Sequence, residues 1–357
     1  MKTERCRARE FGLVIGSLQT GPNNAITDVP GVRVGHCSVV KGEGRCKIGE
    51  GPIRTGVTAI LPASDDLFLN KVQAAVHIIN GFGKSIGLLQ VAEVGTIETP
   101  ILITNTLNVS KVADGLLDYL IMDNGLDAPS INPVVMECND FYLSDIWGRH
   151  VGKAEVVAAI EGASNGLVTE GSVGAGTGTA AYGFKGGVGT SSRIVLCGDQ
   201  GFTVGALVVT NMGKPEQLKI GGVPVGRKLI EQGIGPALGG SIIMVLATDA
   251  PLSVNQLRRV AARATHGLAR TGSYSGNTSG DIVLAFSIAR RIPLLPEQPV
   301  LAFSQLADNH IDSFFTAAAD AIEESILNAM FMAETVVGRN GHTLHALPLD
   351  KVKALLG

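Results

Sequence analysis

The chain has 357 residues, of which 45% are apolar, and its 29 basic and 32 acidic residues give a net charge of −3 and a pI near 6.2. This content suffices for the core of one large domain, and no linker composition divides the chain. The lysines and arginines are scattered rather than clustered, which argues against nucleic acid or an anionic membrane as partner and leaves a small molecule or peptide.

The N-terminal segment MKTERCRAREFG is charged where a signal peptide needs an apolar stretch. No apolar run in the sequence reaches the roughly 18 residues of a membrane span. The cysteines are odd in number and form no CxxC pair, which disfavours a disulfide framework and a zinc site. We therefore expect a cytoplasmic protein with reduced thiols and without a metal or other cofactor.

Short apolar segments rich in β-branched residues predict strands at 57–62, 99–105, 132–138, 192–197, 202–211, 241–248 and 281–287. Helical periodicity predicts helices over 109–120, 254–268 and 311–336. The second of these begins with a capping-box pattern, Ser253 to Gln256, and ends before Gly272. Strands grouped in the middle with helices around them favour a layered α+β sandwich over an alternating α/β sheet.

Two glycine motifs resemble nucleotide-binding loops but do not match them. Gly83-Lys84-Ser85 has the end of a P-loop, yet Ile78 stands where the first glycine is required. In EGSVGAGTGTAAYGFKGGVGTSSR, residues 170–193, the frame from Gly174 puts Thr179 at the last position, and the next frame puts further glycines where a helix must run. Glycine turns between antiparallel strands, or backbone amides that shape a substrate pocket, are the two remaining interpretations.

Histidine chemistry finds no support in the sequence. The histidines are dispersed, and His266, on a predicted helix, has no second ligand at metal-binding spacing, so we expect it to interact with the helix dipole. The segment Gly272-Ser-Tyr-Ser-Gly276 does not match the GxSxG motif of serine hydrolases, because Tyr274 lies at its centre.

The segment GGSIIMVLATDAPLS, residues 239–253, places Ser241 after two glycines and directly before a buried strand. A serine without a histidine base can be activated when it is N-terminal, because its own α-amine, with a pKa of roughly 7.7 to 8.0, then acts as the base. This requires a cut between Gly240 and Ser241, and Gly239 and Gly240 let the backbone adopt the strained geometry of such a cut. Attack by Ser241 Oγ on the Gly240 carbonyl would give an ester, and water would then release chains 1–240 and 241–357. The alternative is a simple turn that leads into a core strand.

Further blocks keep a fixed order along the chain: NAITDVPGVRVGH (24–36), TGVTAILP (55–62), TPILITNT (99–106), ECNDFYLSD (137–145), FKGGVGTSSR (184–193), VVTNMG (208–213) and GNTSGDIVLAFS (276–287). Together with GG-SIIMVLATDAPL, this arrangement resembles the DmpA family of self-processing N-terminal nucleophile aminopeptidases, which includes β-peptidyl aminopeptidases. The resemblance runs from about Phe11 to about Ala333. It implies a four-layer αββα sandwich similar to that of the Ntn hydrolases, with the strand connectivity of the ornithine acetyltransferases.

The resemblance also implies roles for individual residues. Ser241 matches the nucleophile and new N-terminus, Asn211 the side-chain amide of the oxyanion hole, and Tyr142 a second donor to the oxyanion. Ser279 and Asp281 match the pair that orients and tunes the amine of the nucleophile. Some relatives carry glutamate at the second position, and aspartate is one methylene shorter, so a direct contact with the amine is in question.

The same resemblance implies a hydrolase that releases a small N-terminal residue, of L, D or β type, from peptides, amides or esters through an acyl-Ser241 intermediate. Glu137 either binds the free ammonium group of the substrate or pairs with a neighbouring cation. We expect a tetramer of cleaved heterodimers without a cofactor. The alternatives are a related acyltransferase or nylon-oligomer-type amidase and, more distantly, a non-catalytic or nucleotide-binding glycine-rich module.

Overall fold

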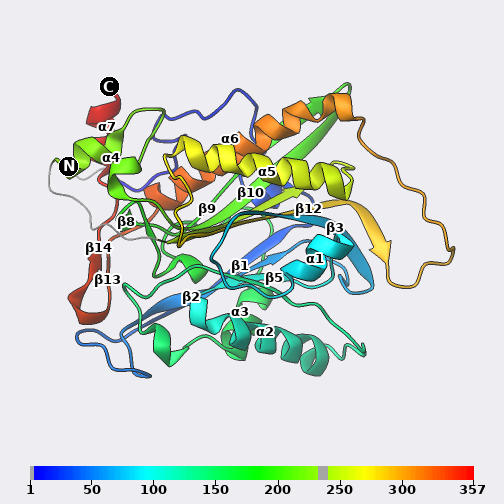
Figure 1. The fold of residues 1–357 in the computed structure, drawn as a ribbon, viewed down its shortest axis with the longest axis horizontal. Helices are drawn as coiled ribbons and strands as arrows, with labels where there is room; N and C mark the ends of the chain where they lie inside the picture. The colour runs from blue at the N-terminus through cyan, green and yellow to red at the C-terminus, as the bar shows by residue number, and fades with distance from the viewer. Residues whose placement is uncertain (1–3, 232–239) are drawn as a thin grey trace.

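Two β-sheets face each other between two layers of helices in the structure, a computed structural model that describes residues 4–231 and 240–357 (Figure 1). The four-stranded sheet has the order β1 (Arg33–Lys41), β2 (Ile53–Leu61), β5 (Ile101–Thr104) and β6 (Val134–Glu137). The six-stranded sheet has the order β4 (Thr96–Ile97), β3 (Asn70–Gly81), β12 (Gly280–Pro293), β11 (Ser241–Thr248), β10 (Gln200–Asn211) and β9 (Val188–Cys197). The β5–β6 and β11–β12 pairs are parallel, and the other pairs in the two sheets are antiparallel.

Helices cover the outer face of each sheet (Figure 1). On the four-stranded sheet lie α2 (Val109–Asp118) and α3 (Lys153–Glu161), and on the six-stranded sheet lie α5 (Val254–Arg270) and α6 (Asp312–Phe331). Shorter helices are α1 (Leu88–Val94), α4 (Val225–Ile230) and α7 (Leu349–Leu356), and a π-helical turn, Tyr119–Asp123, extends α2. Two-residue strands form the hairpins β7 (Ala180–Ala181) with β8 (Phe184–Lys185) and β13 (Val336–Val337) with β14 (Thr343–Leu344). Single 3₁₀ turns lie at Ile26–Asp28, Thr106–Asn108, Ile146–Gly148, Gly174–Gly176, Pro215–Gln217, Asp308–His310 and Arg339–Gly341.

The space between the sheets is filled by apolar side chains from both of them. These include Ile60, Ile103 and Met136 of the four-stranded sheet and Val209, Ile243 and Leu284 of the six-stranded sheet. Because each sheet also packs against helices, β2 and β11 are buried along their whole length. In β11 this burial explains the continuous apolar run from Ile242 to Ala247. The predicted four-layer α+β sandwich is confirmed.

Individual element boundaries differ from the predictions in places. The sequence pattern misses β1 and β3, because both strands expose part of one face and their residues mix polar and apolar character. The predicted helix over 311–336 is too long, because α6 ends at Phe331 and the chain then enters β13. The capping box is confirmed, since Ser253 Oγ accepts a hydrogen bond from Gln256 N at 3.3 Å and Gln256 Oε1 accepts one from Ser253 N at 3.0 Å.

None of the helices in the described ranges combines the length and the apolar character needed to cross a membrane.

Candidate active site

Ser241 is the first residue of β11, and the two strands beside β11 bring the other predicted residues to it. In the antiparallel pairing with β10, Asn211 lies opposite Ser241. In the parallel pairing with β12, Asp281 lies opposite Ile242. Gly280 N, at the start of β12, donates a hydrogen bond of 3.0 Å to Ser241 Oγ. The site is therefore assembled by strand register, which the buried apolar faces of these strands specify.

The peptide bond before Ser241 lies in a narrow space. The carbonyl oxygen of Gly240 accepts a hydrogen bond from Ser279 Oγ. A Cβ on Gly240 would collide with the Asn211 carbonyl oxygen, and a Cβ on Gly280 would lie 2.5 Å from Gly83 Cα and 3.2 Å from Ser241 Oγ. Glycine at both positions thus permits the close approach of the Gly240 carbonyl and Ser241. Gly239, the other glycine of the predicted cleavage motif, lies outside the described residues.

The side-chain amide of Asn211 has a defined orientation. Its Oδ1 accepts a hydrogen bond of 3.0 Å from Ala180 N, which leaves Nδ2 on the side of Gly240. A Cβ built on Gly240 would lie 2.5 Å from this nitrogen. An amide N–H in this place is suited to donate to an oxygen that gains negative charge.

Asp281 is fully buried and acts on its neighbours through one carboxylate oxygen. Its Oδ1 lies 2.5 Å from Ser279 Oγ and accepts a hydrogen bond of 3.2 Å from Ile242 N. Its Oδ2 has no hydrogen-bond partner in the described part of the chain. Burial raises the pKa of Asp281. The shorter acid therefore reaches Ser279 and the residue after the nucleophile, while no hydrogen bond between the described atoms joins it to Ser241 itself.

Glu137, at the end of β6, borders a pocket of about 200 Å³ that also contains Ser241. The pocket is lined by Phe82, Lys84, Thr106, Glu137, Asn139, Gly240, Ser241 and Thr278. Glu137 accepts hydrogen bonds from Thr106 Oγ1 at 2.5 Å and from Lys84 N at 3.0 Å, while Lys84 Nζ donates to the Phe82 carbonyl at 2.8 Å. Burial raises the pKa of Glu137, and the two hydrogen bonds oppose this shift.

A second pocket of about 310 Å³ adjoins the first and shares Gly240 and Thr278 with it. Its remaining lining residues are Gly213, Lys214, Gln217, Ser273, Tyr274, Gly276, Asn277 and Ser279. Gly240 therefore borders both pockets, one with the buried carboxyl group of Glu137 and one with Lys214 on its wall.

Tyr142 is the predicted residue that the structure does not bring to this site. Its ring stacks on His342, with ring centres 4.6 Å apart and an interplanar angle of 16°. It lines neither pocket, and within residues 4–231 and 240–357 no hydrogen bond joins its hydroxyl to Ser241 or Asn211. His266 lies exposed on α5.

Sequence reasoning missed the donors that hold the site together. The main-chain N–H groups of Gly280 and Ala180 bind Ser241 Oγ and Asn211 Oδ1, and Thr106 binds Glu137. Gly280 and Thr106 lie in sequence blocks that carry the family resemblance, and Ala180 lies in the glycine-rich segment. For Gly280 and Ala180 the donor is a main-chain N–H group, which carries no residue-type signal. Gly83, which failed as part of a P-loop, instead packs against Gly280.

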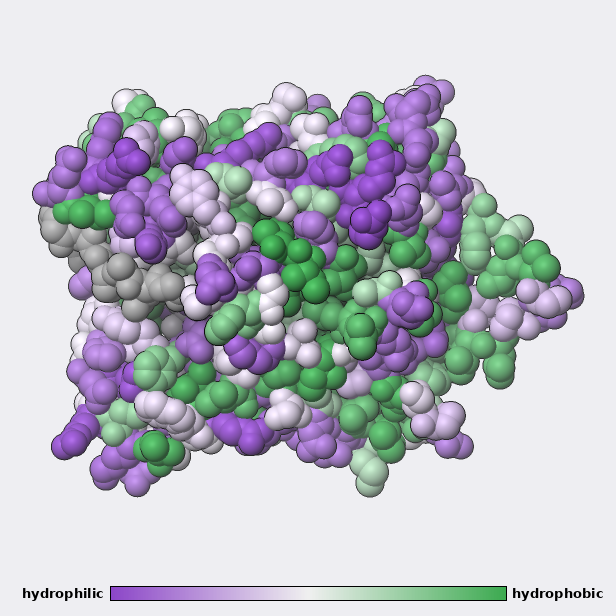
Figure 2. Space-filling view, viewed as in Figure 1, coloured by the Kyte–Doolittle hydropathy of each residue, from purple (hydrophilic) through white to green (hydrophobic). Residues whose placement is uncertain are grey.

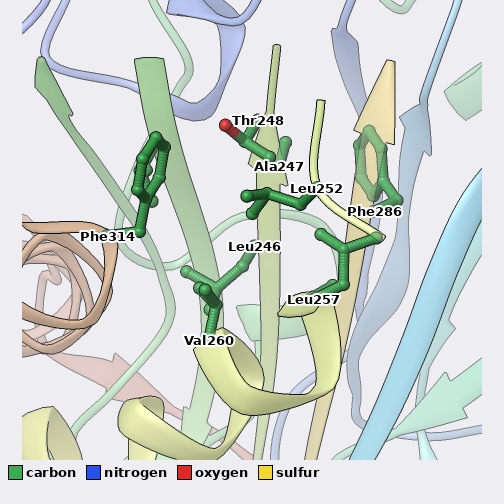
Figure 3. Close-up of a pocket in the computed structure, with 10 residues that line it drawn as sticks. Leu246, Ala247, Thr248, Leu252, Leu257, Val260, Phe286 and Phe314 are labelled. Carbon is green, nitrogen blue, oxygen red and sulfur yellow. The ribbon is translucent and has the colours of Figure 1, made fainter. Parts of the chain in front are cut away.

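A small void elsewhere in the core does not compete as a site. It has a volume of about 10 Å³ and lies at the far end of β11 from Ser241, among Leu246, Leu257, Val260, Phe314 and neighbouring side chains (Figure 3). Such a volume holds about one water molecule. Among the described residues, no three His, Cys, Asp or Glu side chains are grouped as metal ligands would be.

Comparisons with known proteins match the whole chain. The model of "Peptidase family S58" matches residues 24–344. The β-peptidyl aminopeptidase BapA of Sphingosinicella microcystinivorans is 39% identical over 98% of this chain and 91% of its own. The solved PH0078 protein of Pyrococcus horikoshii superposes with a TM-score of 0.93 at 49% identity and covers 98% of both chains. The L-aminopeptidase D-Ala-esterase/amidase of Ochrobactrum anthropi, described as a prototype of the serine aminopeptidases with a variant of the Ntn hydrolase fold, has a TM-score of 0.90 at 39% identity over 98% of both chains.

Proposed function

The chain belongs to peptidase family S58 and is an aminopeptidase of the DmpA type, and from this premise we propose that Ser241 is its nucleophile, freed by cleavage of the Gly240–Ser241 bond. One observation carries the proposal. Ser241 Oγ accepts a hydrogen bond from Gly280 N and lies next to the Gly240 carbonyl, whose oxygen accepts one from Ser279 Oγ. The Asn211 amide lies on the neighbouring strand, at the position paired with Ser241.

Maturation uses the groups around Gly240. Ser241 Oγ attacks the Gly240 carbonyl carbon, the C–N bond breaks, and the proton of Oγ passes to the departing nitrogen, which leaves an ester and a free α-amine. The hydroxyl of Ser279, which donates to the Gly240 oxygen, stabilises the negative charge that forms there. Water then hydrolyses the ester and gives chains 1–240 and 241–357.

Turnover uses the amine that maturation creates. The α-amine of Ser241 takes the proton of Oγ, Oγ attacks the first carbonyl of the substrate, and Asn211 Nδ2 donates to the oxyanion. The proton passes to the leaving amine, and water hydrolyses acyl-Ser241. Ser279 and Asp281, which lie within hydrogen-bond distance of each other, orient the α-amine. A role for Tyr142 as second oxyanion donor stays a prediction from the resemblance.

The substrate needs a free N-terminus and a small first residue. Glu137 binds the ammonium group of the substrate in the pocket of about 200 Å³ beside Ser241, which limits the size of the first residue. The names of the relatives, a β-peptidyl aminopeptidase and an L-aminopeptidase D-Ala-esterase/amidase, support small residues of L, D or β type in peptides, amides or esters. The leaving group lies in the second pocket, beside Lys214.

Replacement of the nucleophile tests the proposal. Wild-type protein gives two chains on a denaturing gel, whereas Ser241→Ala stays a single chain and does not hydrolyse small aminoacyl amides. Ser17→Ala, which alters an exposed serine that lines neither pocket, is the control and is cleaved and active. A wild-type protein that remains one chain and is fully active would exclude the mechanism.

We further propose that the cleaved heterodimers form a tetramer. The support is an extended arm between β12 and α6 that projects from the molecule (Figure 1) and has an apolar surface (Figure 2). Leu295 and Val300 on this arm are 86% and 81% exposed. Exposed apolar groups of this kind mark contact surfaces. Light scattering is expected to give the mass of four heterodimers, and the mass of one would refute the proposal.

A further inference from the structure

The glycine-rich segment that matches no nucleotide-binding loop contains a lysine whose side chain is completely buried. Lys185 has no exposed surface, and its Nζ donates hydrogen bonds to the carbonyl oxygens of Gly176 at 2.7 Å, Thr179 at 3.0 Å and Gly186 at 2.7 Å. A neutral amine has two N–H groups, whereas three carbonyl acceptors match the three donors of an ammonium group. Burial lowers the pKa of Lys185 to about 7, and the charge of nearby Asp140 opposes this shift.

The three carbonyls belong to the segment that wraps the end of β10. Gly186 N donates to the Thr179 carbonyl at 3.1 Å, which closes the loop that includes the β7–β8 hairpin. Gly187 N donates to Thr210 Oγ1 at 2.9 Å, and Thr210 N donates to the Gly187 carbonyl at 2.9 Å. The loop is thus fixed on one side to β10 and on the other side to the ammonium group of Lys185.

Ala180 lies directly after one of these three carbonyls and provides the donor that orients Asn211. Its N–H belongs to the same peptide unit as the Thr179 carbonyl, which Lys185 binds. The two ends of a carboxamide differ in chemistry, since one end accepts hydrogen bonds and the other donates them. A fixed N–H at Ala180 therefore selects the orientation with Oδ1 toward Ala180 and Nδ2 toward Gly240.

We propose that Lys185 is a positioning residue for the oxyanion hole: by binding the carbonyls of Gly176, Thr179 and Gly186 it fixes the Ala180 N–H, which keeps the Asn211 amide nitrogen turned toward the reacting carbonyl. The proposal rests on the role of Asn211 given under Proposed function. Lys185 does not touch the substrate, so it acts on the reaction only through Asn211.

A double-mutant cycle tests this dependence. Lys185→Met keeps the length of the side chain and removes its donors, and we expect kcat to fall about 10-fold with little change in KM, because an oxyanion donor acts mainly in the transition state. Asn211→Ala lowers kcat about 100-fold or more. In the Asn211→Ala background, Lys185→Met should change kcat by less than about 2-fold, because the two residues act as one unit.

Arg5→Met is the matched control. Arg5 also binds three carbonyls, those of Phe331, Ala333 and Leu347, but it lies away from the site. Its effect on kcat should be the same with Asn211 or Ala at position 211. All variants are compared per cleaved chain, with processing read from a denaturing gel and folding from circular dichroism.

Each outcome decides one proposal. If Asn211→Ala leaves kcat unchanged, the oxyanion role of Asn211 fails. If Asn211→Ala lowers kcat and Lys185→Met lowers it by the same further factor in both backgrounds, only the positioning role fails. If neither Lys185→Met nor Lys185→Gln folds, Lys185 belongs to the folding core, and the positioning role is likewise overturned.

Discussion

Glu137 is a buried carboxyl group that Thr106 Oγ1 and Lys84 N hold at the edge of the pocket beside Ser241. In the proposed function, its ionised form binds the ammonium group of a substrate. Because burial raises its pKa, the carboxylate is protonated at a higher pH than an exposed glutamate. As pH falls through this raised pKa, we expect KM to rise for substrates with a free amine.

The variant Glu137→Gln is expected to raise KM at least 10-fold at neutral pH, about the effect of losing one charge-assisted hydrogen bond, and to remove the acid-side rise of KM. KM measured from pH 5 to 8 checks this. Glu161→Gln, on the exposed end of α3, is the control and should leave the profile unchanged. A Glu137→Gln enzyme with the wild-type profile would mean that Glu137 does not bind the substrate and only accepts the hydrogen bonds of Thr106 and Lys84.

Asp281 is predicted to set the pH at which the enzyme becomes active. A carboxylate near the α-amine of Ser241 favours the ammonium form and raises the pKa of this amine, so activity appears at higher pH. In Asp281→Asn, the rising limb of kcat/KM should therefore move to lower pH. The variant must be shown by gel to be cleaved, and Asp249→Asn, at the other end of β11, serves as control. An unshifted limb in a fully cleaved Asp281→Asn enzyme would limit the role of Asp281 to the fold.

The side chains of the site were easier to predict than their supports. Ser241, Asn211, Ser279 and Asp281 belong to blocks that resemble a known family, and the structure brings them together. Tyr142 belongs to such a block as well, but its ring stacks on His342. The residue type alone does not tell where a ring packs, so the sequence could not predict this contact. The N–H groups of Gly280 and Ala180 depend on backbone geometry and only follow from the structure.

At the scale of elements, a continuous apolar run is the clearest strand signal in the sequence. The fully buried β11 was predicted with its observed ends, since it forms a continuous apolar run. The partly exposed β1 and β3 were missed, because one face of each contacts solvent or loops and breaks the pattern. Helix α5 was predicted from its capping box and apolar stripe, two local signals that do not depend on the rest of the fold.

Packing of α6 onto the six-stranded sheet gives a stability prediction. Phe314 is fully buried and borders the void at the far end of β11 (Figure 3). Phe314→Ala enlarges an existing cavity and should lower the free energy of unfolding by about 3–5 kcal/mol, while kcat/KM of the folded enzyme stays the same. Urea unfolding and activity assays check both parts.

The neighbouring Phe315→Ala is the control. It removes a partly exposed ring that stacks with Arg263 and should lower the free energy of unfolding by less than Phe314→Ala. Equal costs for the two variants would contradict this account.

For the whole molecule, the proposed cleavage site lies inside a core that both resulting chains would share. Residues 1–240 supply β10 and residues 241–357 supply β11, which pair along the whole of β11. A buried ion pair of 2.7 Å between Arg193 and Glu324, both without exposed side-chain surface, also joins the two parts. The two chains should therefore separate on a denaturing gel and elute together in native chromatography. Independent elution would show that the pairing of β10 with β11 does not persist after cleavage.

Strand β11 lies in the middle of the six-stranded sheet, between β10 and β12, so the sheet cannot form without it. Cleavage before β11 would therefore change how the protein folds. The uncut chain folds in a unimolecular reaction, with residue 240 tethered to residue 241. After cleavage, the same native contacts can be regained from the denatured state only by an encounter of two chains, and the yield then depends on concentration. The proposed maturation is thus a one-way step: it would create the catalytic amine and would remove the unimolecular folding route that built the site. On dilution from urea at nanomolar concentration, Ser241→Ala should recover its fold, whereas the mature wild-type protein should not.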